Sequence, residues 1–332
     1  MGSGIKGLAA TLLCAASLAA QAIATEWTVV NLTPEGIGVA TAVSQNGTVT
    51  GCRNTSGNTT QAFIYANGTR RDLAAAAGSM SCGYAVNNSG VVAGRIDGDI
   101  VVWDAAGNAR ALGAKGSPTG ISDGGVVVGT MGEDYATRRA FMWQNGTFTD
   151  LGVQGTAIGI NASNQIAIIA NDGALFTWEG GVLRRLGNGT VTNAYGFNDR
   201  GEIVGMSSFG HGPEPFIYDG SIRSLPGGGN YAGAVAINNV GQALGSGEGV
   251  YGYLIEAGSS ARLDALAGNA LHHSEGKSIN DRGWIVGQNG SPDFNAFLMV
   301  PKQAASTQVS GGNPAARLMN RVSSLIRAGD RR

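Results

Sequence analysis

Short apolar runs rich in Val, Ile, Phe and Trp follow one another from about residue 27 to residue 301, separated by polar turns that contain glycine. Each run is roughly four to eight residues long, which is typical of strands rather than helices. Asn-Gly pairs such as Asn46-Gly47 and Asn67-Gly68 stand between runs, and they are a strong hairpin signal because both turn residues need a positive φ. The pattern predicts an all-β fold of many short antiparallel strands.

The pattern repeats about every 38 residues, a period typical of propeller blades and solenoid repeats. Each copy reads apolar–Asn–x–x–Gly–x–Val–Val–Gly, a variable gap, Ala–Phe–x–Trp/Tyr–x–x–Gly and a final Leu. The copies end at Leu32, Leu73, Leu112, Leu151, Leu186, Leu225 and Leu263. The fourth copy departs from the pattern, with Asn164 and Ile168 where the other copies have glycine.

Each copy contains four runs, and four antiparallel strands per repeat are typical of a propeller blade. The seventh copy ends near Pro301 without a fourth run, whereas Trp27–Leu32 is an unmatched fourth run before the first copy. If this run completes the last blade, no sheet edge stays open. We therefore expect residues 25–301 to form a seven-bladed β-propeller of four-stranded antiparallel blades, closed by the N-terminal strand. An open β-solenoid is the alternative.

This cassette resembles the HAF-type extracellular repeat, a β-propeller-like repeat of secreted bacterial proteins, over residues 27–301. It departs from that repeat in having no His before Ala-Phe, where Gln61, Arg139 and Asn295 stand instead. The resemblance implies a repeat fold and an extracellular compartment. It implies no particular chemistry.

The first 24 residues are typical of a secretory signal peptide. Lys6 precedes a short apolar stretch, Leu8–Ala20, and small residues surround a cleavage point before Thr25. The stretch is too short to cross a bilayer, so we expect no transmembrane span after cleavage and an extracellular or periplasmic protein. An uncleaved anchor is the alternative.

Residues 302–332 read as a polar linker and a basic amphipathic tail. After Pro314, apolar residues recur with helical spacing and arginines are frequent. The tail is expected to form a short C-terminal helix docked on the propeller. A frayed tail and a helix on an anionic surface are the alternatives.

Composition narrows the possible partners. Only 14% of the 332 residues are charged and the formal net charge is −1, so nothing favours nucleic acid. No cofactor motif is present. We expect a monomer without a cofactor.

Cys52 and Cys82 are the two cysteines outside the signal peptide. The end of a second strand and the start of the next blade's first strand lie at the same face, so the spacing predicts a disulfide between the first two blades. Two buried thiols are the alternative.

The candidate ligand-binding residues lie in loops on that same face. The longest acidic and aromatic insertion, Met131–Arg139, carries Glu133, Asp134 and Tyr135. The other candidates are Asp293 in an equivalent loop, His211, and the pair His272 and His273 in a long connection. Solvated loop tips are the plainer interpretation, and the histidines lack the ligand spacing of a zinc site.

The recurrent asparagine of the repeat suggests either a binding ring or a structural role. It occurs as Asn87, Asn161, Asn198, Asn238 and Asn280. Because an Asn side chain at a strand end readily accepts hydrogen bonds from the backbone of the following turn, we expect a structural role.

Variable loops on a rigid repetitive scaffold favour non-catalytic recognition of a surface glycan, a peptide or a partner protein. The alternative is a secreted hydrolase or lyase in which Glu133, Asp134 or a histidine acts as acid and base. Propellers serve both classes, so the fold does not decide between them. A structural role in an envelope layer is the third hypothesis.

Overall fold

The computed structural model describes residues 26–57, 59–210, 212–227, 232–247, 251–268 and 270–302. Within these residues the protein is all-β, as predicted, with one short helix, α1 (Leu263–Leu266). The expected signal peptide and the basic tail beyond Lys302 lie outside the described residues.

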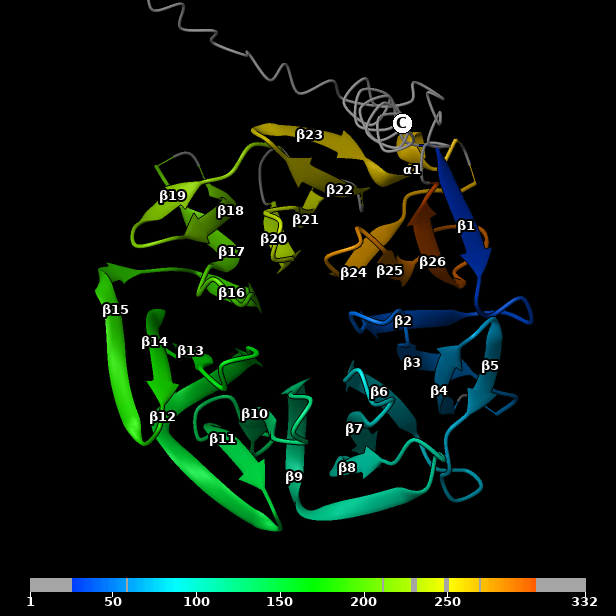
Figure 1. Ribbon diagram of the computed structural model, residues 1–332, viewed down its shortest axis with the longest axis horizontal. Helices are drawn as coiled ribbons and strands as arrows, with labels where there is room; N and C mark the ends of the chain where they lie inside the picture. The colour runs from blue at the N-terminus through cyan, green and yellow to red at the C-terminus, as the bar shows by residue number, and fades with distance from the viewer. Residues whose placement is uncertain are drawn as a thin grey trace, which may run out of the picture.

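The described strands lie around a central axis, like the blades of a propeller (Figure 1), and they form four antiparallel sheets of four strands and one of ten. Three groups are separate sheets formed by strands consecutive in the chain. The first contains β2 (Gly38–Val43), β3 (Val49–Asn54), β4 (Thr60–Ala66) and β5 (Thr69–Asp72). The second contains β16 (Asn193–Phe197), β17 (Ile203–Ser208), β18 (Pro213–Tyr218) and β19 (Ile222–Ser224). The third contains β20 (Gly233–Ile237), β21 (Ala243–Gly247), β22 (Tyr251–Glu256) and β23 (Ser259–Arg262).

A fourth sheet joins the two ends of the described chain. It contains β24 (Glu275–Ile279), β25 (Ile285–Gln288), β26 (Ala296–Pro301) and β1 (Trp27–Asn31). β1 pairs antiparallel with β26, from Trp27 opposite Pro301 to Asn31 opposite Phe297. This is the pairing that the unmatched N-terminal run predicts.

The remaining strands form one sheet of ten strands. They are β6 (Ser81–Val86), β7 (Val92–Ile96), β8 (Asp99–Trp103), β9 (Ala109–Ile121), β10 (Val127–Met131), β11 (Arg139–Gln144), β12 (Thr147–Ile160), β13 (Ile166–Ala170), β14 (Ala174–Glu179) and β15 (Val182–Thr190).

Two long strands, β9 and β12, explain why this sheet is continuous. The first half of β9 pairs with β8 and its second half pairs with β10, and β12 joins β11 to β13 in the same way. Among the described residues, the hydrogen bonds therefore form five sheets, not the seven separate blades expected. The link from the outer strand of one group to the inner strand of the next stays extended here, with Gly113 and Gly152 at positive φ.

The first strand of each group lines the centre of the molecule. In chain order these inner strands are β2, β6, the second half of β9, the second half of β12, β16, β20 and β24 (Figure 1). Each contacts the next, and β24 contacts β2.

The backbone explains why both recurrent positions of the repeat are glycine. The first follows the inner strand and takes a positive φ, as at Gly90 (φ 76°), and Asn164 takes its place with φ 61°. The second lies in the second strand beside a register shift of the inner strand. A Cβ on Gly129 would lie 2.2 Å from the Ser117 backbone oxygen, so no side chain fits there.

The recurrent aromatic residue of the third strand fills the space between neighbouring groups. Phe63 on β4 is fully buried and packs with Val286 and Leu298 of the sheet that contains β1. Trp103 on β8 packs against Ile64 of the preceding group.

Candidate functional site

Two faces of the molecule are distinguished by their connections. Successive strands alternate in direction, so the hairpins that follow the inner strands lie on one face, here named the hairpin face. The loops between second and third strands and the connections between groups lie on the opposite face, here named the loop face. The candidate residues that the structure describes, Glu133, Asp134, Tyr135, His272, His273 and Asp293, belong to connections of the loop face.

The β10–β11 loop carries Glu133, Asp134 and Tyr135, and the structure holds it firmly. The Tyr135 side chain is 60% exposed, and the Arg138 guanidinium lies 4.0 Å from its ring centroid. Asn171, from the neighbouring β13–β14 turn, accepts a hydrogen bond from Arg138 Nε at 3.2 Å and donates one to the Tyr135 backbone oxygen at 2.9 Å. This network fixes an exposed aromatic ring at the surface.

The two acidic residues of this loop have partners of their own. Glu133 Oε1 lies 3.7 Å from Arg95 Nη2 of β7. Asp134 Oδ1 accepts a hydrogen bond from the Ala136 backbone N–H at 2.8 Å, which shapes the loop turn. Both carboxylates thus support the position of Tyr135.

His272, His273 and Asp293 come together around the β25–β26 loop. Asn289 links two of them, because its Oδ1 accepts from the His272 N–H at 2.7 Å and its Nδ2 donates to Asp293 Oδ2 at 3.2 Å. His273 Nε2 lies 3.1 Å from the Tyr251 hydroxyl at the start of β22. His211 lies outside the described residues.

An arginine completes this second group. The Arg262 guanidinium lies 3.7 Å from the Tyr251 ring centroid and pairs with Asp264. The hydrogen bond from Arg262 is the largest cause of the lowered pKa of the Asp264 carboxyl.

The candidate residues therefore form two groups, one around Tyr135 and one around Tyr251. In the described part of the chain, no hydrogen bond, ion pair or ring contact joins these groups. No set of three or more His, Cys, Asp and Glu side chains among the described residues is placed to hold a metal ion.

Cys52 of β3 and Cys82 of β6 form a disulfide with a Cα–Cα distance of 4.8 Å. The bond ties the group that contains β2 to the ten-stranded sheet on the loop-face side.

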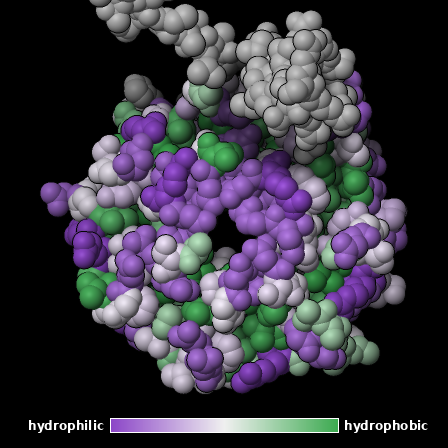
Figure 2. Space-filling model, viewed as in Figure 1, coloured by the Kyte–Doolittle hydropathy of each residue, from purple (hydrophilic) through white to green (hydrophobic). Residues whose placement is uncertain are grey.

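A central cavity of about 490 Å³ is lined by all the inner strands and by the turns that follow them. Hydrophilic residues gather around its opening (Figure 2). Tyr84 of β6 and Tyr195 of β16 line the cavity with 36% and 44% of their surface exposed. Their strands are separated by two inner strands in one direction and three in the other, so the two tyrosines lie on opposite sides of the cavity. Partial burial raises the pKa of the Tyr195 hydroxyl, against a hydrogen bond with Asn193.

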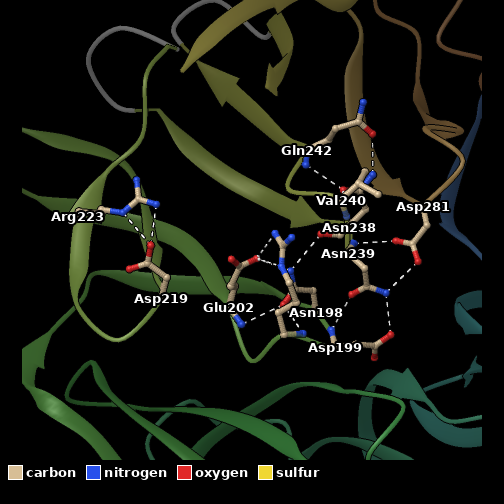
Figure 3. A network of polar contacts seen from close by, with 11 residues as sticks. Asn198, Asp199, Glu202, Asp219, Arg223, Asn238, Asn239, Val240, Gln242 and Asp281 are labelled. Atoms are coloured by element: carbon tan, nitrogen blue, oxygen red, sulfur yellow. Dashed lines mark hydrogen bonds and ion pairs between the residues drawn. The ribbon is translucent and has the colours of Figure 1, made fainter. Parts of the chain in front are cut away.

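The recurrent asparagine stabilises the hairpin face in two ways (Figure 3). Asn238 Oδ1 accepts from the backbone N–H groups of Val240 at 3.2 Å and Gln242 at 2.9 Å, which closes its own turn. Asn238 Nδ2 donates to the backbone oxygen of Asn280 at 3.0 Å in the next turn. The first bond is the one that the sequence predicts, and the link to the next turn is additional.

A second circle of hydrogen bonds involves the residue after the recurrent asparagine. The residues at this position are Gln45, Asn88, Asp123, Ala162, Asp199, Asn239 and Asp281. The Asp199 N–H donates to Asn239 Oδ1 at 2.8 Å, and the Asn239 N–H donates to Asp281 Oδ1 at 2.7 Å (Figure 3). Seven pairs of neighbouring turns surround the opening, and six of these pairs are joined by such a bond. In one of the six, the donor is the N–H of Asn46 and not that of Gln45.

The recurrent asparagine alone did not predict this circle. A usable signal existed, since the following position is polar in six copies and an alanine only at Ala162. The meaning of that signal depends on which turns are neighbours in space.

Comparison with known proteins supports the fold alone. The chain matches no known protein-family profile and none of the curated proteins compared with it. It is similar in structure to YCF48 bound to a D1 peptide, with a TM-score of 0.54 and 14% identity over 84% of this chain and 97% of that one. It is also similar to an oligogalacturonate lyase in complex with manganese, with a TM-score of 0.57 and 13% identity over 84% of this chain and 94% of that one. Both likenesses establish a propeller-like fold.

The residues that the structure describes contain no helix with the length and apolar character of a membrane span.

Proposed function

We propose that this protein is an exported, non-catalytic binding protein, a seven-bladed propeller of HAF-type repeats that recognises a peptide, glycan or protein partner through its loop face. Counting the ten-stranded sheet as three blades that share β9 and β12 gives seven blades. The unbroken succession of contacts between inner strands supports this count. The signal-like N-terminus and the disulfide support export, because disulfides persist in oxidising compartments.

The exposed and braced Tyr135 is the observation that carries the proposal of binding. A tyrosine offers a large amphipathic contact surface, and fixing it in advance lowers the entropic cost of recognition. Arg138 and Asn171 supply that bracing. The similarity to YCF48, which was solved with a peptide, makes a peptide the first partner to test.

The test is to screen the purified protein on peptide and glycan arrays and then to titrate a hit against Tyr135→Ala. We expect the loss of this anchor to weaken binding by about tenfold or more. Val240→Ala is the matched control, because it removes a side chain of similar exposure (61%) from the hairpin face.

Equal affinities of wild type and Tyr135→Ala for every hit would contradict the proposal. Mass spectrometry of the same mixtures tests the alternative hydrolase or lyase. Conversion of a hit into product, abolished by Glu133→Gln, would replace the binding function with an enzymatic one.

A further inference from the structure

The second circle of hydrogen bonds, around the opening of the central cavity, is here named the rim. It has one gap, at Ala162. Ala162 and the flanking Asp123 and Asp199 all line the cavity of about 490 Å³. Asp123 and Asp199 are exposed at the opening. This is a different part of the molecule from the Tyr135 loop.

The complete rim shows what the gap lacks. Asn239 lies between Asp199 and Asp281 (Figure 3). Its Oδ1 accepts from the Asp199 N–H at 2.8 Å, and its Nδ2 donates to Asp199 Oδ2 at 2.7 Å and to Asp281 Oδ2 at 2.9 Å. One primary carboxamide thus satisfies one N–H donor and two carboxylates.

Ala162 occupies the same position between Asp123 and Asp199, but its methyl group can form none of these bonds. Only its backbone contributes, because the Ala162 N–H donates to Asp199 Oδ1 at 2.7 Å. Within the residues described, the Asp123 N–H has no acceptor, and neither carboxylate forms an ion pair. The nearby Arg200 is occupied by Glu202 at 2.8 Å.

We propose that this gap binds the primary carboxamide of an Asn or Gln side chain in an extended peptide. The ligand's carbonyl oxygen accepts from the Asp123 N–H, and its NH₂ group donates to the Asp123 and Asp199 carboxylates. A carboxylate ligand would be repelled by these two aspartates. The acetamido group of a sugar has one N–H and could not reach both.

The cavity beyond the rim has room for an extended peptide that lies along the inner strands. Tyr195 precedes Asp199 by four residues, as Tyr84 precedes Asn88, so the tyrosines lie roughly 13 Å further in along the inner strands. Apolar side chains such as Ile160 and Phe197 line the stretch between. About four extended peptide residues span this distance, and the tyrosine rings then contact the distal end of the ligand.

The test uses the peptide Ac-Gly-Gly-Gly-Gly-Gln-Gly-Gly-Gly-Gly-NHMe, in which Gln carries the one primary carboxamide and four residues on either side can reach the tyrosines, and titrates it into the full-length protein by calorimetry. The matched probe has Glu in place of Gln, and N,N′,N″-triacetylchitotriose tests the acetamido alternative. We expect binding of the Gln peptide alone. Ala162→Asn supplies the missing carboxamide from the chain itself and should weaken this binding at least about tenfold, whereas Ala162→Gly leaves the gap open and should preserve it.

Thermal unfolding is the second readout. Ala162→Asn should unfold at the same temperature as wild type or higher. A loss of binding in this variant is then not caused by unfolding. The proposal is overturned if the Gln peptide fails to bind wild type at about 10 mM, if the Glu peptide or chitotriose binds equally well, or if Ala162→Asn binds as tightly as wild type. Tyr135→Ala should leave this binding unchanged, so the outcome is independent of the loop-face function.

Discussion

At the scale of single residues, the recurrent asparagine shows how one side chain serves both its own turn and the neighbouring one. Asn87, Asn198, Asn238 and Asn280 each accept backbone hydrogen bonds locally and donate one to the next turn. Asn161 accepts the local bonds from Ser163 and Gln165. In the described chain it donates none to a neighbouring turn, so the two kinds of bond can be separated by mutation.

Asn87→Ala should therefore destabilise the protein more than Asn161→Ala. Both substitutions leave two backbone N–H groups without their acceptor, but only the first also removes the bond to the next turn. We expect a difference in the free energy of unfolding of about 1 kcal/mol, measured by urea denaturation. Equal losses would mean that the bonds between turns contribute nothing to stability.

At the scale of the strand, a glycine stands opposite the register shift in most of the inner hairpins because a side chain would meet the inner strand's backbone. A Cβ added to the glycine would come within about 2 Å of a backbone oxygen at Gly51, Gly94, Gly129, Gly205 and Gly287. Gly245 is the exception, where the nearest backbone oxygen is 3.7 Å away. The repeat sequence revealed these glycines, but only the paired strands explain them.

Gly129→Ala should lower the free energy of unfolding by at least about 2 kcal/mol, because the clash with backbone forces the hairpin apart. Gly245→Ala is the matched control and should cost less than about 1 kcal/mol, since its closest neighbour is a side-chain atom, the Ile255 Cδ1 methyl group at 3.2 Å, and not the backbone. Equilibrium denaturation of the two variants measures both changes in the free energy of unfolding. Similar values would refute the steric explanation.

At the scale of the whole molecule, the repeat predicted the all-β fold, the hairpins and the pairing of β1 with β26. It did not predict that β9 and β12 continue from one group into the next. In the sequence alone, glycines such as Gly113 and Gly116 are equally consistent with a turn between two strands and with a bend in one extended strand. The described candidate residues lie in loops, and their separation into two groups depends on partners such as Asn171 and Tyr251, which lie far away in sequence.

A circular permutant should fold, because Lys302 and Glu26 already meet. The Lys302 N–H donates to the Glu26 backbone oxygen at 2.6 Å, and the side chains pair at 2.9 Å. Joining these residues by a short linker and opening the chain at the exposed Asn145-Gly146 turn should keep the circular dichroism spectrum and cooperative unfolding. Opening it within β1 instead should abolish both, and a folded product there would show that the β1–β26 pairing is dispensable.

The sheet shared by β1 and β26 also imposes an order on biogenesis. Of the described strands, β1 is synthesised before all the others and its hydrogen-bonding partner β26 after all the others, so this sheet cannot be completed until β26 has been made. A product truncated before β26 would present β1 as an unpaired, partly apolar edge. Such an edge is the kind of surface that chaperones and proteases detect, so the fold marks any product that lacks β26.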